Sequence, residues 1–350
     1  MLARALLRIG VDATMVSPAG KGHARTQRHA VEALARVAGV ELVAFVRSAE
    51  AAALLPLGTV VVRERPSILW EQLGLPLRAR GLDAVLTLSD RLSVLPQPPT
   101  VVWLFESPAH RIAQNRRAGA GAYQRGADRL TEALWPRSLR HAAHVCFGSR
   151  ATAAEVVAEL PELDGRTSVV YPGLAPGFSP GPAPDRGRYV FHLGSTDPRD
   201  NTHTAIEACR LAGVRLLVAG GVRINAGGAD VELLGRVSDE ELVGLYRGAA
   251  AYLDPTLYEG FGYGVLEAMA CGAPVVASDR TSIPEVAGDA GLLCDPESPE
   301  ALATALRRVL DEPGLAEELR SRGFERARRF TWSATAEALH AALAAVARRR

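Results

Sequence analysis

The chain has 350 residues, of which 48% are hydrophobic and 23% are charged, and its formal net charge is +1. This composition excludes an intrinsically disordered chain, and the length predicts two domains of ordinary size. No apolar run reaches the roughly 18 residues that a membrane span needs, and the N-terminal segment lacks the apolar middle of a signal peptide. We therefore expect a cytoplasmic protein.

Short apolar runs alternate with helical patterns through the first half. Strands are predicted near Arg8–Val16, Val40–Val46, Thr59–Arg63, Ala84–Leu88, Thr100–Phe105, His144–Phe147 and Ser168–Tyr171. Several of these runs are continuously apolar, as expected for parallel strands that are covered on both faces. Helical patterns such as Ala24–Val37 and Ala151–Leu160 separate most of them. The alternation predicts a doubly wound parallel sheet in a first domain, residues 1–172.

A segment rich in proline and glycine, residues 173–187, is predicted to be an interdomain linker, because proline fixes φ and removes backbone donors. The strand–helix pattern then restarts in a second domain, residues 188–330. Its strands are predicted near Tyr189–Leu193, Val214–Val218, Val231–Leu234, Ala250–Leu253, Pro274–Ala277 and Gly291–Cys294. Residues 331–350 are expected to form a helix that crosses back to the first domain. Open parallel sheets bind ligands beyond the carboxyl ends of their strands, so both domains are expected to face one cleft.

Charge and cysteine content add two expectations. Residues 1–180 carry 21 Lys and Arg against 15 Asp and Glu, whereas residues 181–350 carry 19 against 24. The arginines are densest from Arg111 to Arg150, which would suit an anionic acceptor or a phospholipid surface, or is simply a solvated face. The four cysteines have no metal or redox spacing, so reduced core thiols and no metal are expected. They are Cys146, Cys209, Cys271 and Cys294.

The most informative segment contains a glycine-rich turn, EGFGYG, between a predicted strand and a predicted helix. Glycines let backbone amides approach a ligand, and a helix N-terminus carries partial positive charge, so a diphosphate would fit here. Glu259 and Glu267 have seven residues between them, about two helical turns, so both carboxylates can lie on one side of the ligand. Such acceptors suit pairs of sugar hydroxyls. The alternative is a surface helix with two ordinary glutamates.

This segment resembles the retaining glycosyltransferases of family 4, whose signature has the form EGFGxPxxE. The resemblance extends to HLGSTDPRDN, to PVVASDRTSIPEVAGDAGLLCDPESPEAL and, in the first half, to RHAAHVCFGSRATAAEV. It implies the GT-B fold, in which two Rossmann-like domains face a cleft. It also implies transfer of a mannosyl-, glucosyl- or rhamnosyl-like group from a nucleotide-diphospho-sugar to a glycan, lipid-linked or small-molecule acceptor. Neither a cofactor nor a metal nor nucleic acid is expected, whereas peripheral membrane contact through the basic half is an option.

By this resemblance Glu259 would bind donor sugar hydroxyls, Glu267 the ribose, and Arg199 the leaving diphosphate. The implied donor-binding residues are Gly194, Ser195, Arg199, Asn201, Arg223, Glu259, Gly260, Phe261, Gly262, Tyr263, Gly264 and Glu267. The implied catalytic residues are Glu259, Arg199, Glu106 and His110. A loop over the cleft would comprise Gly20, Lys21, Gly22 and His23.

Three positions depart from the family pattern. Asp200 stands where a lysine is usual, and its carboxylate is expected to point away from a diphosphate. Gly264 replaces a proline, which loosens the start of the helix. Phe105 and Glu106 stand where many members have a histidine, and the nearest histidine is His110.

Because of these departures, other functions stay open. A weakly active or inactive sugar-nucleotide-binding protein is one alternative, and a same-fold epimerase or phosphorylase is another. A dehydrogenase is disfavoured, because the first strand is followed by GKGH and not by the GxGxxG fingerprint of dinucleotide-binding domains.

Overall fold

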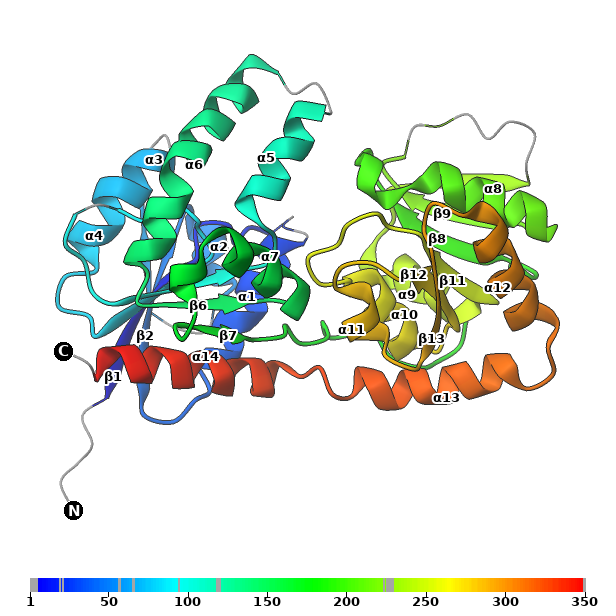
Figure 1. Cartoon of the computed structure of the whole chain (residues 1–350). Coiled ribbons are helices and arrows are strands. Elements are labelled where there is room, and N and C mark those ends of the chain that lie inside the picture. The colour runs from blue at the N-terminus through cyan, green and yellow to red at the C-terminus, as the bar shows by residue number, and fades with distance from the viewer. Residues whose placement is uncertain are drawn as a thin grey trace. The chain divides into compact units, whose positions relative to one another are not determined.

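The computed structural model describes residues 6–18, 20, 22–55, 58–64, 67–93, 95–117, 121–222, 224 and 230–348. The chain divides into two compact units (Figure 1), the first made of residues 1–173 with 331–350 and the second of residues 174–330. Each unit is built on one parallel sheet. The predicted fold class, two doubly wound α/β domains, is confirmed. Among the described helices, none has the length and apolar character of a membrane span.

The first unit has a seven-stranded sheet with the order β3-β2-β1-β4-β5-β6-β7. Its strands are β1 (Leu7–Asp12), β2 (Val40–Val46), β3 (Thr59–Val61), β4 (Ala84–Thr87), β5 (Thr100–Leu104), β6 (His144–Phe147) and β7 (Thr167–Val169). Its helices are α1 (His23–Leu34), α2 (Ala49–Ala53), α3 (Ser67–Leu69), the π-helix η1 (Trp70–Gly74), α4 (Leu75–Arg78), α5 (Pro108–Arg117), α6 (Ala122–His141), α7 (Arg150–Glu159), the 3-10 helix η2 (Pro161–Leu163) and α14 (Trp332–Ala347).

The final helix, α14, is part of the first unit and packs against α1, β4 and β5 (red in Figure 1). The Thr335 hydroxyl donates to the Tyr171 carbonyl at 2.8 Å, and the rings of Trp332 and His29 lie 5.4 Å apart. A side chain at Gly173 would place its Cβ 2.4 Å from the Trp332 nitrogen, so only glycine fits there. The helix therefore completes the hydrophobic core of this unit.

The second unit has a six-stranded sheet with the order β10-β9-β8-β11-β12-β13. Its strands are β8 (Val190–Gly194), β9 (Leu216–Gly220), β10 (Val231–Gly235), β11 (Ala251–Asp254), β12 (Val275–Ser278) and β13 (Gly291–Cys294). Its helices are η3 (Pro198–Asp200), α8 (Thr202–Ala212), α9 (Asp239–Gly248), α10 (Tyr263–Cys271), α11 (Ile283–Ala287), α12 (Pro299–Asp311) and α13 (Leu315–Ala327).

Strand order reverses once in each sheet, between β1 and β4 in the first unit and between β8 and β11 in the second. Loops that leave the carboxyl ends of such a pair turn in opposite directions and leave a crevice, which is where open α/β sheets bind ligands. The fold thus singles out the ends of these two strand pairs as the places to look for a site.

The four cysteines are all free thiols, with Cys146, Cys209 and Cys271 buried and Cys294 half-buried. Burial raises the pKa of the Cys146 thiol to about 11 and that of Cys209 to about 12, so both stay protonated at neutral pH. Such thiols act as small apolar side chains.

The end of β9 approaches the end of β8 so closely that glycine is required at position 220. A Cβ on Gly220, whose φ is +112°, would lie 1.7 Å from the Gly194 carbonyl oxygen, whereas a Cβ on Gly221 would meet nothing within 4 Å. We predict that Gly220→Ala lowers the free energy of unfolding by about 2 kcal/mol or more. Gly221→Ala, the matched control, should change it little in urea unfolding. Equal effects of the two substitutions would contradict the close approach.

Candidate functional site

The loops that follow β8 and β11 are hydrogen-bonded to each other. The Arg199 carbonyl accepts from the Leu257 amide at 2.8 Å and from the Thr256 hydroxyl at 3.1 Å. Asn201, in the left-handed conformation with φ 53°, donates from its side chain to the Pro255 carbonyl at 3.0 Å. Asparagine tolerates this conformation better than most residues. Hydrogen bonds therefore hold the two loops at the switch point together.

The loop after β8 also fixes the direction of its arginine. The Arg199 guanidinium donates from Nε and Nη2 to Asp197 Oδ2, at 2.9 and 2.7 Å. Asp197 Oδ1 accepts from the Arg199 amide at 2.9 Å, and Ser195 Oγ accepts from the Asp197 amide at 3.0 Å. Burial works against ionisation of Asp197, but the hydrogen bonds from Arg199 outweigh it and lower its pKa. Arg199 is thus pre-oriented, 5.9 Å from the Tyr258 ring centroid.

The glycine-rich turn is clamped by the loop that follows β12. The Glu259 amide donates to Thr281 Oγ1 at 3.1 Å, and the Ser282 hydroxyl donates to the Glu259 carbonyl at 2.7 Å. Gly262, with φ 102°, precedes α10, and a Cβ there would lie 2.9 Å from the Ile283 side chain. The turn therefore has one conformation, set by its neighbours.

Three carboxylates converge at this turn, from the loop after β8, the end of β11 and the turn itself. Burial raises the pKa of Glu259 to about 8, helped by the charges of Asp254 and Asp200 and opposed by Arg199. Burial and the charge of Asp200 raise the pKa of Asp254 to about 7. The charge of Asp200 acts on both of these groups, and whether its carboxylate points away from a bound diphosphate stays a prediction. Its own pKa is raised by burial, although it accepts a hydrogen bond from Ser195.

One of the three departures from the family pattern, the glycine at position 264, has a structural basis in a buried cluster. The Tyr252 hydroxyl donates to Asp254 Oδ2 at 3.3 Å, and both side chains are buried. A Cβ on Gly264 would lie 2.3 Å from that hydroxyl and 3.5 Å from Asp254 Oδ2. Glycine therefore stands in place of proline because Tyr252 and Asp254 occupy the space. The sequence analysis did not identify this pair, although Asp254, a carboxylate at the end of a buried strand, could have indicated a site residue.

The two glutamates of the motif differ in access. Glu259 is half-buried, whereas Glu267 is 2% exposed and accepts from the Tyr246 hydroxyl at 3.4 Å. The Gly260 amide donates to the Glu259 carboxylate. Phe261 is buried, with its ring centroid 5.1 Å from Tyr263 and 5.7 Å from Phe330, so it anchors the turn in the unit.

Of the remaining predicted donor-binding residues, Gly194 is closely packed and Arg223 lies outside the described residues. A Cβ on Gly194 would lie 2.8 Å from Thr202 Oγ1 and 3.1 Å from His192 Nε2. Burial lowers the pKa of His192 to about 4, so this imidazole is neutral and structural. Arg223, and Lys21 in the other unit, lie outside the described residues.

In the first unit, the predicted loop and the predicted acceptor-side residues come from the ends of β1 and β5. His23 begins α1 after Gly22, whose φ is 55°, and its ring lies 5.5 Å from that of Phe105. A Cβ on Gly148 would lie 2.5 Å from the Phe105 ring, so this ring packs directly against the glycine backbone. His110 pairs with Glu155 at 3.5 Å. Glu106 is half-buried, and Gly20 lies before His23 in the same loop.

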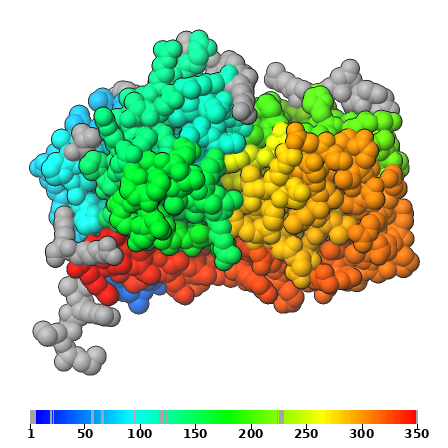
Figure 2. Space-filling view, viewed as in Figure 1, coloured from blue at the N-terminus to red at the C-terminus, as the bar shows by residue number. Residues whose placement is uncertain are grey.

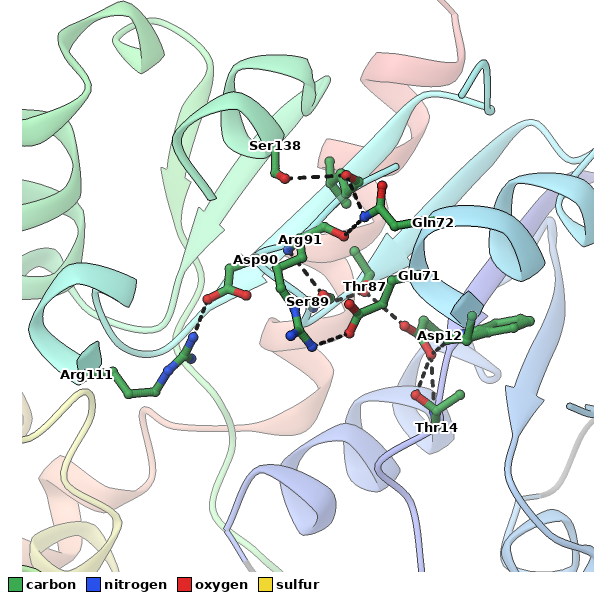
Figure 3. Close-up of polar contacts among 12 residues, drawn as sticks. Asp12, Thr14, Glu71, Gln72, Thr87, Ser89, Asp90, Arg91, Arg111 and Ser138 are labelled. Carbon is green, nitrogen blue, oxygen red and sulfur yellow. Dashed lines mark hydrogen bonds and ion pairs between the residues drawn. The ribbon is translucent and has the colours of Figure 1, made fainter. Parts of the chain in front are cut away.

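A polar network that sequence reasoning did not identify lies at the switch point of the first unit (Figure 3). Asp12, at the end of β1, accepts from the hydroxyls of Thr14 at 2.8 Å and Thr87 at 3.2 Å. Glu71 accepts from Arg91 Nη2 at 2.7 Å, while Glu71 Oε2 and Arg91 Nε are buried without a hydrogen-bond partner among the described residues. Burial raises the pKa of Glu71 to about 7, although Arg91 opposes this.

Three arginines of the arginine-rich stretch are ion-paired with acidic partners. Arg111 pairs with Asp90 (Figure 3), Arg116 with Glu132, and Arg140 with Glu162. Exposed pairs of this kind contribute little to stability, but they remove net positive charge from the face that we expected to be basic.

Comparison with known proteins identifies the second unit. Residues 178–326 match the family model for glycosyl transferases group 1. This unit is a group 1 glycosyltransferase domain. The turn, the loop after β8 and the three converging carboxylates all lie inside the matched range.

A curated relative is the O-antigen chain mannosyltransferase B of Escherichia coli, 35% identical over 161 residues, which are 41% of this chain and 42% of that protein. The chain thus spans less than half the length of this relative.

Solved structures extend the likeness to the whole chain. Sucrose-phosphate synthase from Thermosynechococcus elongatus has a TM-score of 0.70 at 22% identity and covers 95% of this chain and 97% of its own. HepE from Anabaena, in complex with UDP and glucose, has a TM-score of 0.70 at 17% identity and covers 97% of this chain and 100% of its own. The chain has the GT-B fold.

We predict that the stability of the group 1 domain falls as pH rises through the range from about 5 to 8. Glu259 and Asp254 have raised pKa values in the folded state, so folding retains protons that the unfolded chain has already released. Stability is therefore fully present at low pH and is lost through the folded pKa values of about 7 and 8. Each group contributes a slope of up to about 1.4 kcal/mol per pH unit.

The measurement is urea unfolding between pH 5 and 9, followed by circular dichroism. Glu259→Gln should flatten the profile, and Glu300→Gln, at an exposed position of α12, should leave it unchanged. Some slope should remain in Glu259→Gln, because the pKa of Glu71 is also raised. Parallel profiles for wild type and Glu259→Gln would contradict the prediction.

The close packing of Gly264 against Tyr252 can be tested by substitution. Gly264→Ala should destabilise the domain by roughly 2 kcal/mol, because its Cβ overlaps the Tyr252 hydroxyl. In a Tyr252→Phe background the same substitution should cost less than half as much, since the overlapping oxygen is gone. A double-mutant cycle in urea measures this coupling. Additive effects would show that the hydroxyl is not what excludes a side chain.

Proposed function

We propose that the chain is a retaining hexosyltransferase that transfers a mannosyl-like group from a nucleotide-diphospho-sugar to an acceptor hydroxyl. The observation that carries the proposal is the clamped EGFGYG turn at the switch point of a group 1 domain, with α10 beginning at Tyr263. The name of the E. coli relative favours mannose over glucose or rhamnose. A glycan, a lipid-linked sugar or a small molecule would serve as acceptor.

In this proposal the amides at the start of α10 face the diphosphate, and Arg199 meets the charge that develops on it. The bond between the anomeric carbon and the diphosphate oxygen breaks, and the acceptor oxygen bonds to the same face of that carbon. The acceptor proton passes to an oxygen of the leaving phosphate. Helix amides and arginine supply the charge stabilisation that a metal supplies in other transferases, so we propose a reaction without metal or cofactor.

The raised pKa of Glu259 affects how this side chain can bind the donor sugar. With a pKa of about 8, Glu259 holds a proton in most molecules at neutral pH. A protonated carboxyl both donates and accepts hydrogen bonds, so it can pair with two sugar hydroxyls without repelling the diphosphate. Burial is the main cause of this raised pKa, and the charges of Asp254 and Asp200 add to it.

A panel of nucleotide-sugars tests the donor assignment. GDP-mannose is expected to raise the unfolding midpoint more than UDP-, ADP- or TDP-sugars do. Release of free GDP only when an acceptor is added would support transfer over epimerisation or phosphorolysis. Stabilisation by donor without turnover on any glycan, lipid-linked or small-molecule acceptor would favour a sugar-nucleotide-binding protein instead.

We predict that Arg199→Ala lowers turnover by roughly two orders of magnitude, since one preoriented donor to a developing oxyanion contributes about 3 kcal/mol. The matched control is Arg210→Ala on α8, whose guanidinium pairs with Glu207 at the exposed surface. It should leave turnover unchanged. Equal turnover of the two variants would remove Arg199 from the reaction.

A further inference from the structure

A row of leucines lies exposed on a helix of the first unit. The helix runs without a break through α3, η1 and α4, from Ser67 to Arg78. Leu69, Leu73 and Leu77, four residues apart, are 44%, 47% and 50% exposed, and we call these three residues the leucine face. The helix lies at the surface of the first unit, where α3 and α4 stand in Figure 1 and where Figure 2 shows cyan residues. Contiguous exposed apolar side chains of this kind mark interaction sites.

The π-helical turn in the middle keeps the three leucines in line. In an α-helix, positions four residues apart drift around the axis by roughly 40°. The turn Trp70–Gly74 has i to i+5 hydrogen bonds and therefore holds more residues per turn, which offsets that drift between Leu69 and Leu73. The result is a narrow apolar row along one side of the helix.

Polar anchors on the opposite side prevent the helix from turning its leucines inward. The Trp70 indole is buried and donates to Asp12 Oδ1 at 3.1 Å, and Glu71 is ion-paired with Arg91. The Gln72 side chain donates to the carbonyls of Arg91 and Leu92, both at 3.1 Å. Rotation of the helix would break these bonds and leave buried polar groups without partners. The exposure of the leucine face is thus fixed by the fold.

The charges beside the leucine face are mostly positive. Arg63 and Arg80 are exposed, whereas the exposed Arg78 and the acidic neighbour Glu64 neutralise each other in an ion pair. Arginines flanking an apolar helix face are the pattern of helices that lie in the interface of an anionic membrane. A stable protein dimer needs about 800 Å² from each partner, and one row of three leucines is much narrower than such an interface.

We propose that the leucine face docks on a bilayer surface that carries anionic headgroups. The leucines enter the boundary between headgroups and acyl chains, while Arg63 and Arg80 meet lipid phosphates. This surface is distinct from the arginine-rich stretch around α5 and α6, where Arg111, Arg116 and Arg140 are ion-paired. The inference is independent of the donor and of the reaction proposed above.

The test is flotation of the full chain with vesicles of phosphatidylcholine alone or mixed with phosphatidylglycerol. Wild type should float with the mixed vesicles. Leu69→Gln/Leu73→Gln/Leu77→Gln should reduce its partition by at least about tenfold. The matched control, Leu130→Gln/Leu233→Gln, replaces leucines that are 39% and 41% exposed elsewhere and should float like wild type. Arg63→Gln/Arg80→Gln should weaken binding to the mixed vesicles only.

Unchanged urea midpoints and unchanged stabilisation by nucleotide-sugar would show that the variants are folded. Wild type that fails to float with mixed vesicles would overturn the proposal, as would a triple leucine variant that floats like wild type. Concentration-dependent self-association that disappears in the triple variant, without vesicle binding by wild type, would identify an interface between copies and would also overturn it.

Discussion

The carbonyl oxygen of Arg199 is the point on which the candidate site depends. It receives two donors from the loop after β11, and so it joins the loops of the two strands that flank the switch point. Glu259 follows only two residues after Leu257, and its own amide and carbonyl are bonded to Thr281 and Ser282. A turn rich in glycine would otherwise sample many conformations. The position of the carboxylate is therefore set by three loops together, each at the carboxyl end of a parallel strand.

The electrostatics of this arrangement run against the simplest expectation for a diphosphate site. The charges of Asp200 and Asp254 act on Glu259, and the guanidinium of Arg199 is already bonded to Asp197. Burial and mutual repulsion resolve the conflict, because they keep protons on Glu259 and Asp254 near neutral pH. An anionic ligand at this place would raise both pKa values further. By linkage, binding of such a ligand would be coupled to proton uptake by these two carboxylates. Protonation would thus remove the negative charge that would otherwise repel the ligand.

Sequence patterns predicted the strands well because buried parallel strands are continuous apolar runs. The first strand was placed at Arg8–Val16 but ends at Asp12, whose carboxylate accepts from Thr14 and Trp70 and turns the chain. The glycine-rich turn and its helix were also predictable from local spacing. Tyr252 and Asp254 were not, because their importance lies in the space they take from Gly264. Glu71 was hidden for a similar reason, since its helix turns glutamate inward and leucines outward.

That inverted helix connects the two observations that the proposed transferase reaction does not use. Its inner side contributes Trp70 and Glu71 to the buried network at the first switch point, and its outer side carries the leucine face. Hydrophobic burial would favour the opposite rotation, and an unpaired Glu71 oxygen adds a further cost. A sequence under selection for stability alone would replace the glutamate and bury the leucines. The outward leucines are explained if the outer side of this helix meets an apolar phase, as the proposed docking on a bilayer requires.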